Sequence, residues 1–115
     1  MSAEERLQEL GLDLPEAAQP LGSYVTIVRT GNLLFTAGHL PTAVDGKSWQ
    51  GKLGAEYSIE EGAEAARLTG LNILATVKAA IGSLDQVARV VKLIGFVNSA
   101  SGFSPQPAGI NGCSD

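Results

Sequence analysis

Residues 24–41 are the stretch that most constrains the fold, and they spell YVTIVRTGNLLFTAGHLP. Two runs of apolar and β-branched residues, 24–29 and 33–37, flank a short polar break. Within that break Gly31 and Asn32 tolerate positive φ, as the tight turn of a β-hairpin requires. The pattern therefore predicts two antiparallel strands that belong to a sheet.

The end of the second predicted strand carries the candidate chemistry. Gly38 has no side chain, so its backbone N–H can face open space, and the polar ring of His39 follows directly. Such a strand end can hold a small anion, although Gly38 can also be a simple turn residue. His39 suits a general base at neutral pH or a structural role. Tyr24 is the first residue of the predicted hairpin. It either contacts a ligand or is a half-buried aromatic residue.

A long helix is predicted after the hairpin. Ser58 with Glu61 three residues later forms a capping-box pattern, and the apolar stripe that follows runs to residue 80 or 81 before Gly82. The first part of this stripe consists of small residues, which would allow close approach to a sheet: Ala63, Ala66 and Gly70.

Residues 87–97, VARVVKLIGFV, are apolar on both faces apart from Arg89 and Lys92. This pattern predicts a central strand that is covered on both sides. One helix and one hairpin cannot cover both faces, so we expect a second subunit to complete the cover.

Shorter elements are predicted at the two ends. Ser2 and Glu5 form another capping box, which predicts a helix that ends at Gly11. Ser104 and Pro105 are expected as the N-cap and the first residue of a final helix. Between the hairpin and the long helix, residues 42–54 are predicted to form a loop that can include one short strand.

Composition limits the classes of function. The 115 residues, 44% of them hydrophobic, predict a single domain, with a helix and connector at 1–20 and the core at 21–115. A net charge of −4 without a basic stripe makes nucleic acid an unexpected partner. No apolar run is long enough to cross a membrane, the N-terminus is unlike a signal peptide, and a lone Cys fits the cytoplasm. A single His and a single Cys exclude a Cys/His metal cluster, and we expect no cofactor.

Several stretches in order resemble the reactive intermediate deaminase family, also called Rid or YjgF, once labelled endoribonuclease (L-PSP) or translation inhibitor. Residues 22–24 are similar to its G-P-Y opening, and 31–41, GNLLFTAGHLP, to its G-N-hydrophobic-T-S-G-Q-hydrophobic-P signature. Residues 65–91 resemble its long helix, G-S-L-D-x-V turn and central strand. Residues 95–99, 106–107 and 110–112 are similar to a branch with a lengthened turn before the second helix.

The resemblance implies a two-layer α/β (α+β) domain with the chorismate-mutase-like fold, in which a mixed sheet packs on two helices. Members of the family form homotrimers with small-ligand clefts between subunits. In those clefts an Arg on a late strand binds a carboxylate, and water attacks a reactive imine to release ammonia.

The departures from the family pattern limit what can be transferred. The family's late strands have no counterpart before Asp115, and neither do the Arg and the water-orienting Glu that belong to them. The catalytic residues are therefore unknown. We expect either a truncated product or neighbouring chains that take the place of the missing strands. Tyr24 and Gly38 match the family, whereas Ala37 replaces its Ser and His39 its Gln. The family's Asn aligns best with Ser101, and Asn98 either lines the cleft or forms a turn. The expected ligand-binding residues are thus Tyr24, Ala37, Gly38, His39, Asn98 and Ser101.

Three functions remain open at this point. The first is hydrolytic deamination of enamine and imine metabolites, similar to a 2-iminobutanoate/2-iminopropanoate deaminase. The second is a non-catalytic module of the same fold that binds small carboxylates or has a regulatory role. The third is RNA cleavage or translation inhibition, which the acidic charge disfavours.

Overall fold

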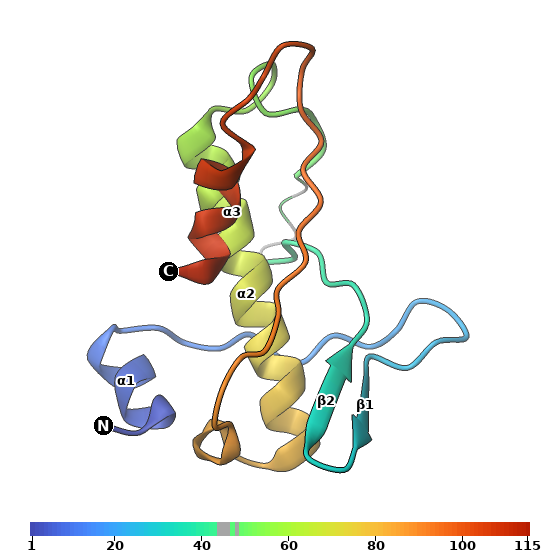
Figure 1. Ribbon diagram of the computed structural model, residues 1–115, viewed down its shortest axis with the longest axis vertical. Coiled ribbons are helices and arrows are strands. Elements are labelled where there is room, and N and C mark those ends of the chain that lie inside the picture. Colours follow the sequence, from blue (N-terminus) through green and yellow to red (C-terminus); the bar gives the residue numbers. More distant parts are fainter. Residues whose placement is uncertain (44–46, 48) are drawn as a thin grey trace. The chain divides into compact units, whose positions relative to one another are not determined.

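A computed structural model describes residues 1–43, 47 and 49–115 (Figure 1). The described residues form two compact units. The first unit comprises Met1–Leu40 and Asn72–Val90, and the second comprises Pro41–Leu71 and Val91–Asp115. Helix α2, Ile59–Ile81, runs through both, with its N-terminal half in the second unit.

In the first unit, helix α1 spans Ala3–Glu9 and begins as predicted. The Ser2 hydroxyl accepts the Glu5 N–H at 3.2 Å, and the Glu5 carboxylate accepts the Ser2 N–H at 3.1 Å. These two bonds satisfy N–H groups that a helix start otherwise leaves open. The capping box is therefore confirmed, and Gly11 follows with a φ of 67° that ends the helix.

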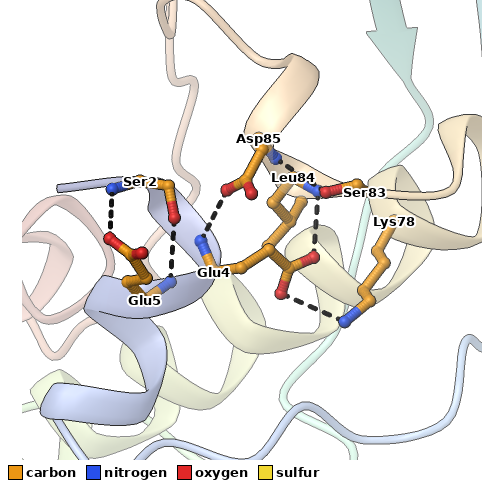
Figure 2. A network of polar contacts seen from close by, with 7 residues as sticks. All are labelled: Ser2, Glu4, Glu5, Lys78, Ser83, Leu84 and Asp85. Atoms are coloured by element: carbon orange, nitrogen blue, oxygen red, sulfur yellow. Dashed lines mark hydrogen bonds and ion pairs between the residues drawn. The ribbon is translucent and has the colours of Figure 1, made fainter.

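Helix α1 is joined to the end of α2 through Glu4 (Figure 2). The Glu4 carboxylate accepts the Leu84 N–H and pairs with Lys78 Nζ, both at 3.1 Å. In return, the Glu4 N–H donates to Asp85 Oδ1 at 2.9 Å. Leu84 and Asp85 belong to a 3₁₀ turn, η1 (Leu84–Gln86), and the Leu84 side chain is only 3% exposed. The backbone donor and Lys78 lower the pKa of Glu4 from its ordinary value.

The predicted hairpin is present, with β1 at Ile27–Thr30 and β2 at Leu33–Thr36. The strands pair antiparallel around a turn in which Gly31 has a φ of 58°. The predicted residues 24–26 precede the first strand. Because side chains alternate across a sheet, Val28, Phe35 and Leu33 lie on one face, where they are 49%, 59% and 48% exposed. The hairpin thus carries an open apolar face.

The prediction of a central strand at residues 87–97 is wrong for this structure. Among the described residues the sheet consists of β1 and β2 alone, and residues 87–97 form no named strand. Their apolar side chains are largely exposed, with Val91 at 77% and Phe96 at 93%. β-propensity reflects packing against neighbours, and no strand pairs with this segment within the described chain. The apolar pattern is present, but the pairing that would make it a strand is absent.

The second unit is organised around Leu53. Its backbone bonds to Asn98 and Ala100, with the Leu53 N–H donating to the Asn98 carbonyl at 3.0 Å and the Leu53 carbonyl accepting at 2.9 Å. A Cβ at Gly62 would meet the Leu53 side chain at 2.5 Å, and one at Gly109 at 3.1 Å. Both glycines therefore leave the room that Leu53 fills.

Helix α3, Gln106–Ser114, packs on the N-terminal half of α2 (Figure 1). A Cβ at Gly112 would lie 1.9 Å from the Ala63 carbonyl oxygen, and one at Gly70 would lie 3.1 Å from Cys113 Sγ. The small residues of α2 thus admit α3, whereas the sequence predicted that they would admit a sheet.

The N-cap of α3 is Pro105 rather than Ser104, so the predicted helix start is wrong by one residue. The loop predicted at 42–54 includes residues 44–46 and 48, which lie outside the described residues. Trp49 of this loop packs on Tyr57 with 5.6 Å between ring centroids, and Lys47 Nζ lies 3.8 Å from the Trp49 ring centre.

In the described part of the chain, no helix combines the length and the hydrophobicity needed to cross a membrane.

Candidate functional site

The strand end after β2 lies against the C-terminal half of α2, within the first unit. The His39 ring makes two contacts: Nδ1 lies 2.9 Å from the Ala37 carbonyl oxygen, and Nε2 lies 2.8 Å from Thr76 Oγ1 on α2. A second tie follows one residue later, where the Asn72 side-chain amide donates to the Leu40 carbonyl at 3.1 Å. These contacts fix the segment that was predicted to carry the chemistry.

The contacts of His39 define its tautomer. A carbonyl oxygen only accepts, so Nδ1 must carry the proton that is donated to Ala37. In the neutral ring Nε2 is then the acceptor, and the Thr76 hydroxyl donates to it. A helical threonine more often donates to the carbonyl four residues earlier, as Thr69 does to Ala65 at 2.9 Å. Both nitrogens of His39 are thus engaged, which favours the structural role over that of a free base.

Gly38 and Tyr24 remain accessible. A Cβ at Gly38 would meet no atom within 4 Å, and within the described chain no acceptor is recorded for its N–H. Its φ is not positive, so the absence of a side chain, rather than an unusual backbone, distinguishes this position. Tyr24 is 51% exposed and precedes β1. The Ala37 N–H donates to the Thr26 carbonyl at 2.8 Å and extends the pairing of the hairpin.

The two remaining expected site residues belong to the second unit. The Asn98 side-chain amide donates to the Gly51 carbonyl at 3.3 Å, and Ser101 lies in a turn closed by the Phe103 N–H and the Ala100 carbonyl. Both side chains are exposed. The structure therefore brings Ala37, Gly38 and His39 together, with Tyr24 in the same unit, and places Asn98 and Ser101 in the other.

Sequence reasoning missed Thr76 and Asn72, each only 3% exposed. They lie four residues apart on α2, and residues at that spacing share one helix face. Two polar residues at this spacing within an apolar helix were the available signal, because buried polar groups require hydrogen-bond partners. Elsewhere, burial raises the pKa of Cys113, which argues against a reactive thiol. No three potential metal ligands gather in the ranges that the structure describes.

The sequence matches a family model over residues 4–115. The description of that family is "YjgF/chorismate mutase-like, putative endoribonuclease". The chain belongs to the YjgF family. Protein TCP17 of Trypanosoma cruzi is 45% identical over 109 residues, which cover 95% of this chain and 68% of that protein.

Solved structures agree with this assignment. A "putative endoribonuclease" from Shewanella oneidensis superimposes with a TM-score of 0.92 at 37% identity, covering 99% of this chain and 76% of the other. The protein Atu1372 of Agrobacterium tumefaciens, of unknown function, gives 0.85 at 43% identity and covers 96% and 68%. The predicted family and fold class are confirmed.

Residues 31–41, which resemble the family's signature, include β2 and the strand end that follows it. At that strand end the His39 ring bonds to Thr76 on α2. This arrangement holds the Gly38 peptide beside a fixed ring, and a Cβ at Gly38 would meet open space.

Proposed function

We propose that this YjgF-family chain forms part of a cytoplasmic, homotrimeric hydrolase that deaminates reactive enamines and imines. The observation that carries the proposal is the strand end, where the Gly38 N–H has no acceptor within the described chain, on a segment tied to α2 through His39 and Asn72. A substrate carboxylate could accept this N–H without displacing a protein partner.

The chemistry requires little from the protein. An enamine tautomerises to the imine, water adds to the C=N carbon, and the resulting carbinolamine expels ammonia to leave a 2-oxo acid. The protein has to hold the carboxylate and orient the water. A strand end fixed by two hydrogen bonds to a helix is preorganised for the first task. No residue is assigned as the catalytic acid or base.

The open face of the hairpin supports an oligomer. Val28, Leu33 and Phe35 lie together on one face of the sheet and are each about half exposed. Exposed apolar faces of this kind mark protein contacts. A neighbouring copy would cover this face and supply the other wall of a cleft at the strand end.

The test is imine turnover. An amino-acid dehydratase would generate the 2-iminobutanoate from threonine in the presence of semicarbazide, which traps the imine. We expect the chain to speed release of the 2-oxo acid and ammonia, and so to lower the yield of trapped imine. Gly38→Pro removes the N–H, and Gly38→Ala is the matched control that keeps it.

Loss of one hydrogen bond to a charged group costs about 1.5 kcal/mol, or roughly tenfold in KM. We therefore expect KM to rise about tenfold in Gly38→Pro and to change less than twofold in Gly38→Ala, with folding of both checked by circular dichroism. Unchanged imine trapping at high protein concentration would exclude the deaminase. Calorimetric binding of 2-oxobutanoate would then identify the alternative, a carboxylate-binding module without chemistry.

RNA cleavage is the second candidate, favoured by the descriptions of the family and of the Shewanella protein. The net charge of −4 opposes it, because binding to phosphates depends on released counterions and on basic side chains. Cleavage of a labelled RNA that weakens steeply between 50 and roughly 200 mM salt would support this candidate over the deaminase.

A further inference from the structure

A second concave site lies in the first unit, apart from the strand-end loop. Its volume is about 230 Å³. One wall is the connector at residues 17–20, another is the beginning of β1, and the third is the last part of α2. The nine lining residues are Ala17, Ala18, Gln19, Pro20, Thr26, Ile27, Thr76, Ala79 and Ala80.

The lining is uncharged and combines apolar side chains with polar groups. Six of its residues are Ala, Pro or Ile, and the other three carry only an amide or a hydroxyl group. Ligand pockets are characteristically apolar with a few polar groups that orient the ligand. An ion placed here would meet no opposite charge among the lining residues, so the lining offers no electrostatic preference for a charged ligand. An apolar cavity of roughly 150 Å³ holds a benzene molecule, so this volume suits a slightly larger guest.

One lining residue connects this cavity to the strand end. Thr76 lines the cavity, and its hydroxyl lies 2.8 Å from His39 Nε2. Because that hydroxyl donates to the neutral ring, only its lone pairs remain for a ligand donor. An occupant that contacts Thr76 would therefore alter the environment of the His39 ring.

The connector wall is held from its far end. Residues 17–20 belong to an N-terminal arm, defined here as residues 1–20, whose helix α1 is joined to η1 and Lys78 through Glu4 (Figure 2). On its other side the connector leads through residues 21–26 to β1, which begins at Ile27. The cavity thus has one wall from α2, one from the start of the hairpin and one from the connector.

We propose that this cavity binds a small uncharged molecule that combines a short hydrocarbon chain with an amide or hydroxyl group. The inference is independent of the proposed deaminase, whose ligands are carboxylates at the strand end. Neither turnover nor its failure bears on the cavity.

The test is a titration of the full-length protein followed by amide and imidazole NMR signals, with three probes of equal chain length. Hexanamide is neutral, hexanoate is an anion and hexylammonium is a cation. We expect hexanamide to saturate the shifts of Thr76, Ala79 and Ala80 at least tenfold more tightly than either ion. The signal of His39, the single histidine of the chain, should move with them.

Two variants locate the binding. Ala80 is exposed and lines the cavity, so Ala80→Phe should fill it and weaken hexanamide binding at least tenfold. Ala108 is exposed on α3, and Ala108→Phe should leave binding within twofold. If Ala80→Phe does not fold, Ala18→Phe from the opposite wall replaces it. Equal binding of hexanoate, unchanged binding in the filled variant, or shifts that do not saturate would overturn the proposal.

Discussion

At the scale of single residues, the pair His39 and Thr76 is the contact that joins the candidate site to the body of its unit. Thr76 is 3% exposed and its hydroxyl bonds to a ring whose other nitrogen is already engaged. Removing one partner of such a pair leaves the other unsatisfied, which costs more than the bond itself contributes. The role of Thr76 is therefore to position His39.

We expect Thr76→Val to lower the free energy of unfolding by about 1–2 kcal/mol, because Nε2 of His39 loses its partner. Thr76→Ser, which keeps the hydroxyl group, should lose less than half as much. Urea denaturation measures both values. A loss in Thr76→Ser as large as that in Thr76→Val would show that the hydroxyl bond to His39 does not by itself account for the effect.

Residue patterns predicted local structure well where the signal lay within a few positions. Ser2 with Glu5 and Ser58 with Glu61 predicted two helix starts, and both pairs make their reciprocal bonds. Thr76 was missed because its partner lies 37 positions away, and no local rule links a helix residue to a strand end so distant. The expected ligand contacts of Asn98 and Ser101 stay predictions.

At the scale of elements, α1 is a short helix that depends on a few polar contacts. Its seven residues include none that is buried, and a helix of that length has little stability of its own. Glu4 supplies bonds in both directions between α1 and η1. We infer that the ionised Glu4 carboxylate is what keeps α1 in place.

Acid should release α1. The folded state lowers the pKa of Glu4, first through the Leu84 N–H and then through Lys78, so its contribution is complete above the unfolded value of 4.5. That contribution is lost as the pH falls through the lower, folded value. Hydrogen exchange of α1 amides between pH 6 and about 3 should show progressive loss of protection.

Glu4→Gln should reduce α1 protection already at neutral pH and flatten its acid dependence. Glu9→Gln is the control, since Glu9 pairs with Arg6 on the exposed surface of the same helix. The same acid profile in Glu4→Gln as in the wild type would assign the transition to another carboxylate.

The elements also show where prediction from sequence fails. Residues 87–97 have the β-branched, apolar composition of a buried strand, yet within the described chain they pair with nothing and are mostly exposed. The apolar composition of a segment indicates that it has to be buried, whereas its pairing as a strand depends on which other segments are present. The stripe of small residues on α2 was similarly ambiguous. It indicated that another element packs closely against the helix, but not whether that element is α3 or a sheet.

At the scale of the whole molecule, the described chain has few buried apolar side chains. Among its hydrophobic residues only Ala75 and Leu84 count as buried, whereas Val28, Leu33 and Phe35 share an open face. A chain of this size normally buries most of the apolar surface that it exposes when unfolded. Association between copies would supply the missing burial.

Phe35→Asp should therefore dissociate the proposed trimer, because it places a charge at the centre of the apolar face. Analytical ultracentrifugation across a range of concentrations measures the effect, and we expect at least a tenfold shift in the association midpoint. Ala55→Asp adds the same charge at an exposed position of the second unit and should not change the mass. A wild-type chain that sediments as a monomer would refute the trimer itself.

The close approach of Gly112 to the Ala63 carbonyl limits which substitutions can arise at position 112 during evolution. A Cβ at position 112 would lie 1.9 Å from that oxygen, and every amino acid except glycine carries one. Every amino-acid substitution that a single-nucleotide mutation can make at a glycine codon therefore introduces this clash. The spacing between α2 and α3 cannot drift by small steps, so a lineage could leave glycine here only after a compensating change had already moved one helix.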